Sequence, residues 1–328
     1  MMPHKVYYTL KPFVPKAMLL QYRRFWARFV WARYKHEWPI CHAAGTAPSD
    51  WPGWPGEKKF ALVLTHDVDT HRGVRWCRKM LEMERDLGFR SGVFLVAEQY
   101  PIPDDLRDYI TSHECEVGIH GLKHDGRLYS SHAEFQARAI RIRQYLKQWK
   151  AVGFRSPAMH HRLEWLGMLG TEYDCSTFDI DPFEPQPDGM KTIFPFWVAG
   201  TGDHSGYVEL PYTIPQDFTV FILLSQKSVD LWIRKLDWIA ERGGMALLIT
   251  HPDYMDFEGG KSSGCPVYPA RYYTNFLEYI QKKYAGQYWH VLPRDIASLW
   301  KQIRERRNAA QSSTLIERQV NAPSVNSK

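Results

Sequence analysis

The apolar residues of this chain form short runs that alternate with longer amphipathic stretches over residues 58–305. A run of about four to eight apolar residues predicts a buried strand, whereas an apolar residue at every third or fourth position predicts a helix. The strands are expected at 60–65, 92–96, 115–119, 152–155, 173–176, 207–212, 218–224, 245–250 and 288–292. The helices are expected at about 73–87, 103–112, 131–149, 162–169, 228–242, 270–284 and 294–305.

Alternating strands and helices predict parallel strands that are joined by crossover helices. Seven or eight such units in about 250 residues favour an α/β fold of the deformed (β/α)7-8 barrel type over an open sheet. The segment 177–218 is rich in Pro, Gly and Asp and interrupts the alternation, so the barrel should be irregular there. Active sites of such barrels lie at the carboxyl ends of the strands, so polar residues that follow the strands are expected to converge.

Two segments flank this barrel domain of residues 58–305. Residues 1–57 form a basic, aromatic arm that ends in a Pro/Gly/Trp segment. Residues 306–328 are polar and lack periodicity, which predicts a disordered tail.

Charge is distributed unevenly along the chain. Residues 1–36 hold eight Lys or Arg and no acid, whereas the remaining 34 basic side chains are balanced by 36 acidic ones. A near-neutral body disfavours nucleic-acid binding. The five cysteines are scattered without a CxxC pair, which suggests neither a zinc-thiolate site nor a disulfide framework. Because no signal peptide and no apolar run of about 18–20 residues is visible, we expect a cytoplasmic protein.

The arm contains a stretch, residues 17–35, whose pattern predicts a helix with one aromatic and one basic side. Such a helix can lie in a membrane interface, which would give the protein a peripheral contact with the inner face of the membrane. It can equally pack across the barrel and contribute its aromatic side chains to the core. The sequence favours neither alternative. The predicted aromatic stripe consists of Met18, Tyr22, Phe25, Trp26 and Phe29.

Polar side chains that could carry chemistry follow the predicted strands. The run at 60–65 leads into two carboxylates, Asp67 and Asp69, which are costly to bury unless a metal, a cation or a reaction uses them. His120 and His124, four residues apart, follow the third strand. Such a pair is more often incidental, but with an aspartate from another strand it forms a His₂Asp set. Three protein ligands with open positions describe a catalytic divalent-metal site.

Three further residues follow later strands. Arg155 could hold a catalytic carboxylate through its fork of donors, or could pair with a surface acid. His251 could be a satisfied core histidine or a general acid, with Asp174 as the partner that favours its imidazolium form.

The ordered set Thr-x-Asp-x-Asp, His-x₃-His, Arg-x-Pro, Asp-x-Ser and Leu-x-x-His resembles the polysaccharide deacetylase family, that is, the NodB-homology domain of carbohydrate esterase family 4. The resemblance covers about residues 58–295 and implies a deformed barrel. It also implies that Asp67 is the catalytic base and that Asp69, His120 and His124 bind a divalent metal, for which Zn²⁺ is expected. The family's usual Thr-Phe-Asp-Asp-Gly differs here because Val68 separates the two aspartates, as in DVD-bearing members.

The resemblance implies removal of N-acetyl groups from amino sugars of a polysaccharide, a glycan or a lipid-linked glycan precursor, in the synthesis of cell-surface polysaccharide. Arg155 would orient Asp67, and His251 with Asp174 would protonate the departing amine. A backbone N–H near residues 173–175 would stabilise the oxyanion. One alternative is a metal-dependent amidohydrolase that cleaves a non-sugar amide, since a fold does not fix a substrate. Another is a non-catalytic glycan-binding protein, which the presence of every catalytic group disfavours.

Overall fold

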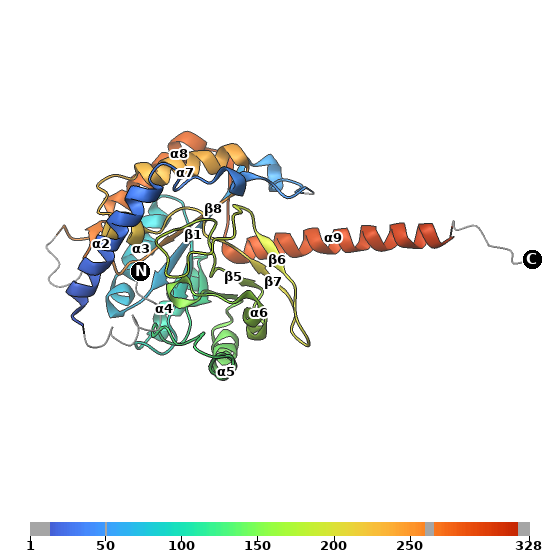
Figure 1. The fold of residues 1–328 in the computed structure, drawn as a ribbon, viewed down its shortest axis with the longest axis horizontal. Helices are drawn as coiled ribbons and strands as arrows, with labels where there is room; N and C mark the ends of the chain where they lie inside the picture. Colours follow the sequence, from blue (N-terminus) through green and yellow to red (C-terminus); the bar gives the residue numbers. More distant parts are fainter. Residues whose placement is uncertain (1–13, 50, 260–265, 321–328) are drawn as a thin grey trace, which may run out of the picture.

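The computed structural model describes residues 14–49, 51–259 and 266–320, and its body is a curled sheet surrounded by helices (Figure 1). The main sheet has nine strands in the order β11-β1-β2-β3-β4-β5-β7-β6, and β8 pairs with β1. Its strands are β1 (Phe60–Val68), β2 (Gly92–Leu95), β3 (Glu116–Ile119), β4 (Gly153–Phe154), β5 (Tyr173–Asp174), β6 (Phe196–Val198), β7 (Tyr207–Glu209), β8 (Met245–Thr250) and β11 (Tyr288–His290). A separate pair consists of β9 (Met255–Asp256) and β10 (Tyr268–Pro269).

The main sheet closes on itself. All of its pairs are parallel except β6 with β7. Beyond β7, the backbone N–H groups of Thr213 and Ile214 donate to the carbonyl of Leu247 in β8, at 3.0 and 3.1 Å. This contact joins the last parallel strand to the strand beside β1. The predicted deformed (β/α) barrel is therefore confirmed.

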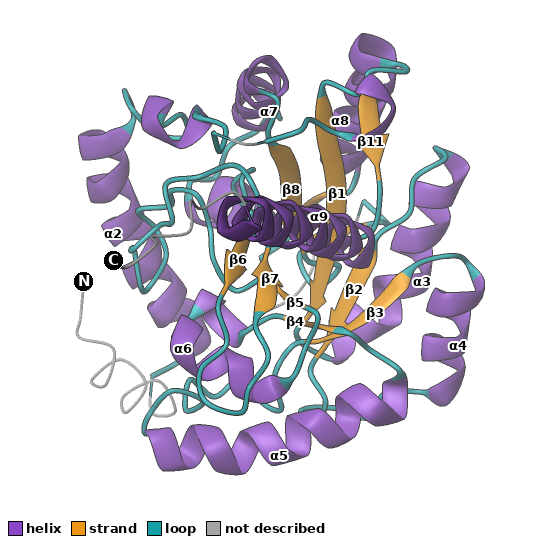
Figure 2. Cartoon of the chain, turned by 90° about the vertical axis from the view of Figure 1, so that its right-hand side faces the viewer, coloured by secondary structure: helices purple, strands orange, loops and turns teal. Residues whose placement is uncertain are grey.

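The helices cover the outside of the barrel, and Figure 2 shows them around the strands. The main helices are α2 (Lys16–Tyr34), α3 (His71–Asp86), α4 (Asp104–Ser112), α5 (His132–Trp149), α6 (Leu163–Leu166), α7 (Asp230–Arg242), α8 (Arg271–Tyr284) and α9 (Pro293–Val320). Short helical turns lie at His42–Gly45, Pro55–Glu57, Pro157–Met159, Gly167–Leu169 and Phe218–Leu223. No helix in the described ranges is both long and apolar enough to cross a membrane.

Alternation along β1 divides the core into two layers. Ala61 and Val63 belong to the cluster inside the barrel, whereas Leu62 and Leu64 belong to the cluster between the strands and the outer helices. Because successive side chains of a strand point to opposite faces, one strand supplies both layers. The same alternation directs Asp67 inward and His66 outward.

Helix α9 closes the amino-terminal end of the barrel. The backbone N–H of Arg294 donates to Glu116 at the start of β3, and Ile296 and Trp300 pack into the barrel interior. Beyond the body, α9 continues to Val320 as a single projecting helix (Figure 1). The predicted disordered tail, residues 306–328, thus begins within a helix, while residues 321–328 lie outside the described part of the chain.

The predicted strand at 218–224 is wrong. Residues Phe218–Leu223 form a π-helical turn, all but its first residue buried, and the carboxylate of Asp217 accepts from the N–H of Phe218. A short apolar run that is buried on all sides has no periodicity that distinguishes a strand from a helix. The antiparallel strand β6 was missed because it lies in the irregular Pro/Gly-rich segment.

The arm lies partly within the described residues. Helix α2 confirms the helix predicted at 17–35, and Ala27 and Val30 on its inner side are buried. Residues 1–13 of the arm lie outside the described residues.

The contact between β3 and α9 predicts a pH-dependent stability. The buried carboxyl of Glu116 accepts from the Tyr173 hydroxyl at 2.7 Å, and burial raises the pKa of Glu116 to about 7 from 4.5. The folded state therefore binds this proton more tightly, and the resulting stability is lost as the pH rises from about 4.5 through 7. As the pH rises over this interval, we expect the free energy of unfolding of Glu116→Gln to increase relative to that of the wild type by roughly 3 kcal/mol. Denaturant unfolding at a series of pH values measures the difference.

The exposed Glu278→Gln on α8 is the control for the substitution itself. A difference in stability between Glu116→Gln and the wild type that does not change with pH would contradict the assignment.

Candidate active site

The carboxyl end of β1 presents Asp67 to the barrel interior and Asp69 to the loop that follows. Asp67 is 3% exposed, and its neighbour His66 points to the opposite side. There the two ring nitrogens of His66 contact Thr250 Oγ1 at 2.7 Å and Glu84 Oε1 at 2.8 Å. His66 is thus a packing residue of the outer layer, as alternation along the strand predicts.

Arg155 is fully buried and holds Asp67. Its Nη1 donates to Asp67 Oδ1 at 2.7 Å, its Nη2 donates to Thr65 Oγ1 at 3.0 Å, and its Nε donates to the carbonyl of Cys175 at 3.1 Å. Burial alone would raise the pKa of Asp67, but Arg155, followed by His120 and His251, holds that pKa below its ordinary value. Of the two uses that the sequence allows for Arg155, the structure shows the orientation of a buried carboxylate.

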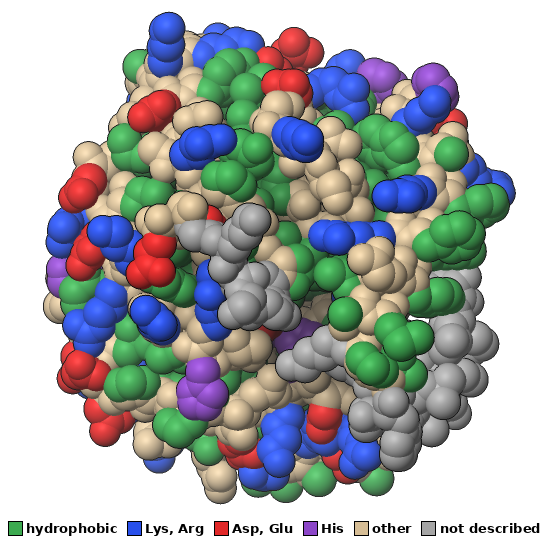
Figure 3. Space-filling view, turned by 90° about the vertical axis from the view of Figure 1, so that its left-hand side faces the viewer, with side chains coloured by type: hydrophobic (Ala, Val, Ile, Leu, Met, Phe, Trp, Pro, Cys, Tyr) green, Lys and Arg blue, Asp and Glu red, His purple; other side chains and the backbone are tan. Residues whose placement is uncertain are grey.

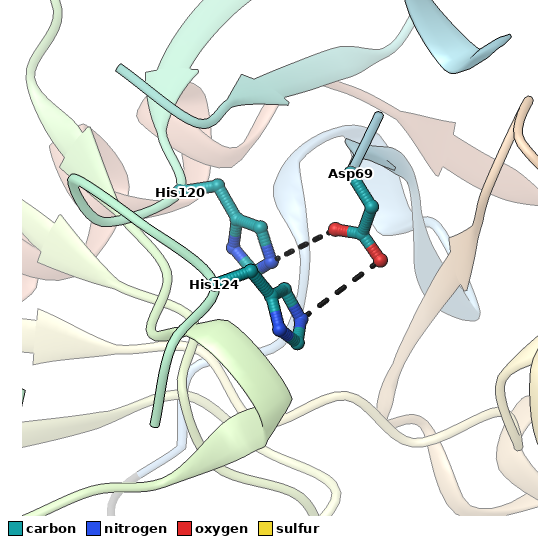
Figure 4. A group of neighbouring side chains, drawn as sticks. All are labelled: Asp69, His120 and His124. Carbon is teal, nitrogen blue, oxygen red and sulfur yellow. Dashed lines mark ion pairs between the residues drawn. The ribbon is translucent and has the colours of Figure 1, made fainter. Parts of the chain in front are cut away.

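Asp69, His120 and His124 come together (Figure 4), and His120 Nε2 also lies 3.7 Å from Asp67 Oδ2. His120 Nε2 lies 3.4 Å from Asp69 Oδ1, and His124 Nε2 lies 3.9 Å from Asp69 Oδ2. Ligand atoms of a tetrahedral site with bonds of about 2.0–2.1 Å lie about 3.4 Å apart, so these separations suit one divalent ion. The three residues come from the loop after β1 and the loop after β3.

Hydrogen bonding shows that this cluster fits a cation. The Nδ1–H of His120 donates to the carbonyl of Arg155 at 3.1 Å, which leaves the lone pair of the neutral imidazole on Nε2. That lone pair faces Asp69 Oδ1, which is buried and has no hydrogen-bond partner in the described structure. Two acceptors that face each other repel unless a cation lies between them. The donor set, two imidazoles and one carboxylate, is one that suits a divalent metal ion.

His251 lies on the other side of the site and is paired with an acid. Its Nδ1 contacts Asp217 Oδ1 at 2.6 Å, and its backbone N–H donates to Asp217 Oδ2 at 2.8 Å. Burial disfavours the charged imidazolium, but the Asp217 carboxylate, followed by Asp69 and Asp67, raises the pKa of His251 to about 10. His251 is therefore held protonated.

The prediction that Asp174 is the partner of His251 is wrong. Asp174 accepts from the backbone N–H and the hydroxyl of Ser176, at 2.7 and 2.8 Å, and is fully buried beside Glu209. The N–H of Ser176 is thus occupied, and the N–H of Cys175 donates to Phe154, so neither is available as the predicted oxyanion donor. Asp217 precedes the apolar run at 218–224 and follows no predicted strand directly, so the rule that site residues follow strands did not identify it.

Two residues that the sequence did not single out hold the backbone of Asp69. Asp253 Oδ2 accepts from the Asp69 N–H at 2.9 Å, and the side chain of Gln99 donates to the Asp69 carbonyl at 3.2 Å. Gln99 also accepts from the N–H of His124 at 2.7 Å, so it connects the loop after β1 with the loop after β3. A Cβ on Gly73 would meet Asp253 Oδ2 at 2.1 Å, which is why a glycine stands there. Both residues follow strands, and only that position could have marked them.

The site opens at the end of the barrel away from α9. This end faces the viewer in Figure 3 and is hollowed near its centre, where a histidine side chain is visible. The polar strand ends therefore do converge on one rim, as the barrel architecture predicts.

The pairing of His251 with Asp217 predicts different effects for two neutralising variants. Asp217→Asn removes the charge that favours the imidazolium, so the pKa of His251 should fall, and turnover should fall by about 10²–10⁴ if His251 is the general acid. Asp174→Asn should leave the pKa of His251 unchanged, since Asp174 contacts Ser176 instead. An NMR titration of the His251 ring in both variants measures this. If the pKa of His251 fell in Asp174→Asn and not in Asp217→Asn, Asp174 would be the partner of His251 after all.

The contact between Asp253 and the Asp69 N–H predicts a change in metal affinity. In Asp253→Asn, an amide donor can face that N–H, which would displace Asp69, so affinity for Zn²⁺ should fall by about 10–100-fold. Competition with a chromophoric chelator measures it. The control is Asp256→Asn, because Asp256 lies three residues further along the chain and its carboxylate accepts only from the backbone N–H groups of Glu258 and Gly259 among the described hydrogen bonds. Equal affinities in the two variants would exclude a positioning role for Asp253.

Comparisons with known proteins rest on structure. No family model matches the sequence. No curated protein matches it either. A solved structure described as a polysaccharide deacetylase from Mycobacterium smegmatis matches with a TM-score of 0.59 at 18% identity, over 80% of this chain and 96% of that chain.

Two other solved structures are similar to the same extent. Puue allantoinase matches with a TM-score of 0.56 at 16% identity, over 77% of this chain and 94% of that chain. A protein described as a polysaccharide deacetylase from Pseudomonas aeruginosa PAO1 matches with a TM-score of 0.55 at 16% identity, over 77% and 95% of the two chains. The chain thus has the fold of these three solved structures, two of which are described as polysaccharide deacetylases.

Proposed function

We propose that this protein is a metal-dependent hydrolase that removes N-acetyl groups from amino sugars of a glycan. The observation that carries the proposal is the convergence of three units at one rim of the barrel. They are a carboxylate held by a buried arginine, a cluster that suits a divalent ion, and a histidine held protonated by an acid. Hydrolysis of an amide needs these three kinds of group, since it requires a base, an electrophile and an acid for the leaving amine.

A cavity beside the metal-ligand loop supports a sugar as the substrate. It has a volume of about 650 Å³, which lies in the range of ligand sites. Lys123, the residue before His124, and Pro157, two residues after Arg155, both line it. His160 and His161 also line it, and each is more than nine-tenths buried. Its wall therefore combines imidazole and charged groups, which suits the hydroxyls of a sugar.

Asp69, His120 and His124 would hold the metal ion. Such an ion, when bound, polarises an amide carbonyl and makes a water far more acidic. Asp67 accepts the proton of the attacking water on Oδ2, because Oδ1 is engaged by Arg155. The interaction with Arg155 also keeps Asp67 ionised and oriented.

His251 supplies the proton for the leaving amine. Its Nδ1 is occupied by Asp217, so the proton is delivered from Nε2. An amine is a poor leaving group as an anion, so its protonation is required for the C–N bond to break. The products are acetate and a free amino sugar.

A second candidate, hydrolysis of a non-sugar amide such as a cyclic ureide, is favoured by one observation. The TM-score of the allantoinase structure, 0.56, lies between those of the two structures described as deacetylases, 0.59 and 0.55. The same groups at the rim could serve either amide, since the fold does not fix the substrate.

Acetate release tests the proposal. The protein, with Zn²⁺ added back after chelation, should release acetate from N-acetylated oligosaccharides or a lipid-linked N-acetylhexosamine, and the chelated protein should not. Asp67→Asn should keep Zn²⁺ but lose turnover by at least about 10²-fold, whereas His124→Ala should lose both.

Three outcomes would contradict parts of the proposal. Turnover of allantoin without acetate release would favour the second candidate. Activity that is indifferent to a strong chelator would exclude the metal. Loss of Zn²⁺ in Asp67→Asn, with Zn²⁺ retained in Asp69→Asn, would exchange the roles of the two carboxylates.

A further inference from the structure

Helix α2 is fastened to the body along its inner side. Ala27 and Val30 are buried there, and Arg24 Nε donates to the carbonyl of Ile222 at 2.8 Å. The Arg23 guanidinium lies 4.6 Å from the centroid of the Phe218 ring. These contacts fix the orientation of the helix, so its outer side faces away from the barrel in a defined direction.

The outer side of α2 presents a continuous apolar stripe. Its members are 63%, 36%, 72% and 60% exposed and are spaced by four, three and four residues, which places them on one face of a helix. Among the described residues, the only other large hydrophobic side chain so exposed is Ile140 on α5, at 54%. The outer stripe consists of Met18, Tyr22, Phe25 and Phe29. Concentration of such side chains on one helix marks an interaction surface.

The charges around the outer stripe indicate what it contacts. Arg28, Arg33 and Lys35 are exposed on the same helix or directly after it. No acidic residue precedes Glu37 in the sequence. A second copy of this helix would bring like charges together, whereas an anionic lipid surface complements both the apolar stripe and the basic side chains.

The same helix borders the active site. Arg23 of α2 stacks on Phe218, the Phe218 and Tyr254 rings lie 5.0 Å apart, and the Tyr254 and His251 rings lie 5.2 Å apart. A surface that binds the outer stripe is therefore separated from the general acid by α2 and two aromatic rings.

We infer that α2 docks the protein onto an anionic lipid bilayer through the outer stripe, with Arg28, Arg33 and Lys35 contacting the headgroups. The helix lies in the interface while its inner side stays packed on the body. The sequence left open whether this helix contacts a membrane or packs on the barrel. In this arrangement its outer side contacts the membrane and its inner side packs on the barrel. This arrangement holds the catalytic rim beside the lipid surface, where a lipid-linked glycan would be presented. The cytoplasmic location expected from the sequence stays a prediction.

Co-sedimentation of the full chain with vesicles tests the inference. The wild type should bind phosphatidylcholine vesicles that contain phosphatidylglycerol, and should bind less when that lipid is omitted or the salt concentration is raised. Replacing both aromatic residues, in Phe25→Ser/Phe29→Ser, should weaken binding by at least about tenfold. Replacing Arg28, Arg33 and Lys35 with Gln should weaken it by about fivefold for each charge, on the anionic vesicles alone.

Ile140→Ser is the matched control, because it removes an exposed apolar side chain from a different helix and should leave binding unchanged. Thermal melting shows that each variant is folded, and acetate release from a soluble oligosaccharide should be unaffected by Phe25→Ser/Phe29→Ser. Failure of the wild type to bind anionic vesicles, or equal binding by the double Phe variant, would overturn the inference. So would a wild-type dimer that this variant dissociates in the absence of lipid, since the stripe would then bind a second copy.

Discussion

The site depends on a single buried guanidinium. Arg155 bonds to Asp67 and Thr65 of β1 and to the carbonyl of Cys175 after β5, and its guanidinium carbon lies 4.3 Å from the centroid of the Phe94 ring in β2. Its own carbonyl accepts from His120 after β3. A buried cation must have its charge and its donors satisfied, and removal of one partner commonly costs about 3–5 kcal/mol. The hydrogen bonds that satisfy the Arg155 guanidinium and carbonyl therefore hold together the ends of β1, β3 and β5.

Arg155 also links the two halves of the chemistry. Through its side chain it fixes which oxygen of Asp67 is free, and through its carbonyl it fixes which nitrogen of His120 is unprotonated. The proposed base and the proposed metal ligand are thus both oriented by one residue. A carboxylate and an imidazole with fixed protonation states need little reorganisation during a reaction.

The sequence was sufficient for the parts of the fold and the site that depend on local pattern. Strand ends could be read from apolar runs, and the barrel architecture then predicted that Asp67, Asp69, His120, His124, Arg155 and His251 would share a rim, as the structure shows. Asp217 was missed because its segment was read as a strand, and because contact with His251, 34 residues away, leaves no trace in local spacing. Asp253 and Gln99 act on backbone groups, which every residue has, so no pattern of side chains reveals them.

Helix α9 and strand β1 together constrain how the chain folds. β1 pairs with β8 and β11, which lie near the other end of the sequence, and Ile296 and Trp300 complete the interior. During synthesis, the carboxyl-terminal half of β1 can pair with β2 at once, but its other edge and its first residues must wait for β8 and β11, which are made much later. Such long-range pairing slows folding and leaves apolar strand edges exposed in the meantime. The interior of the barrel is therefore incomplete until Trp300 has been released.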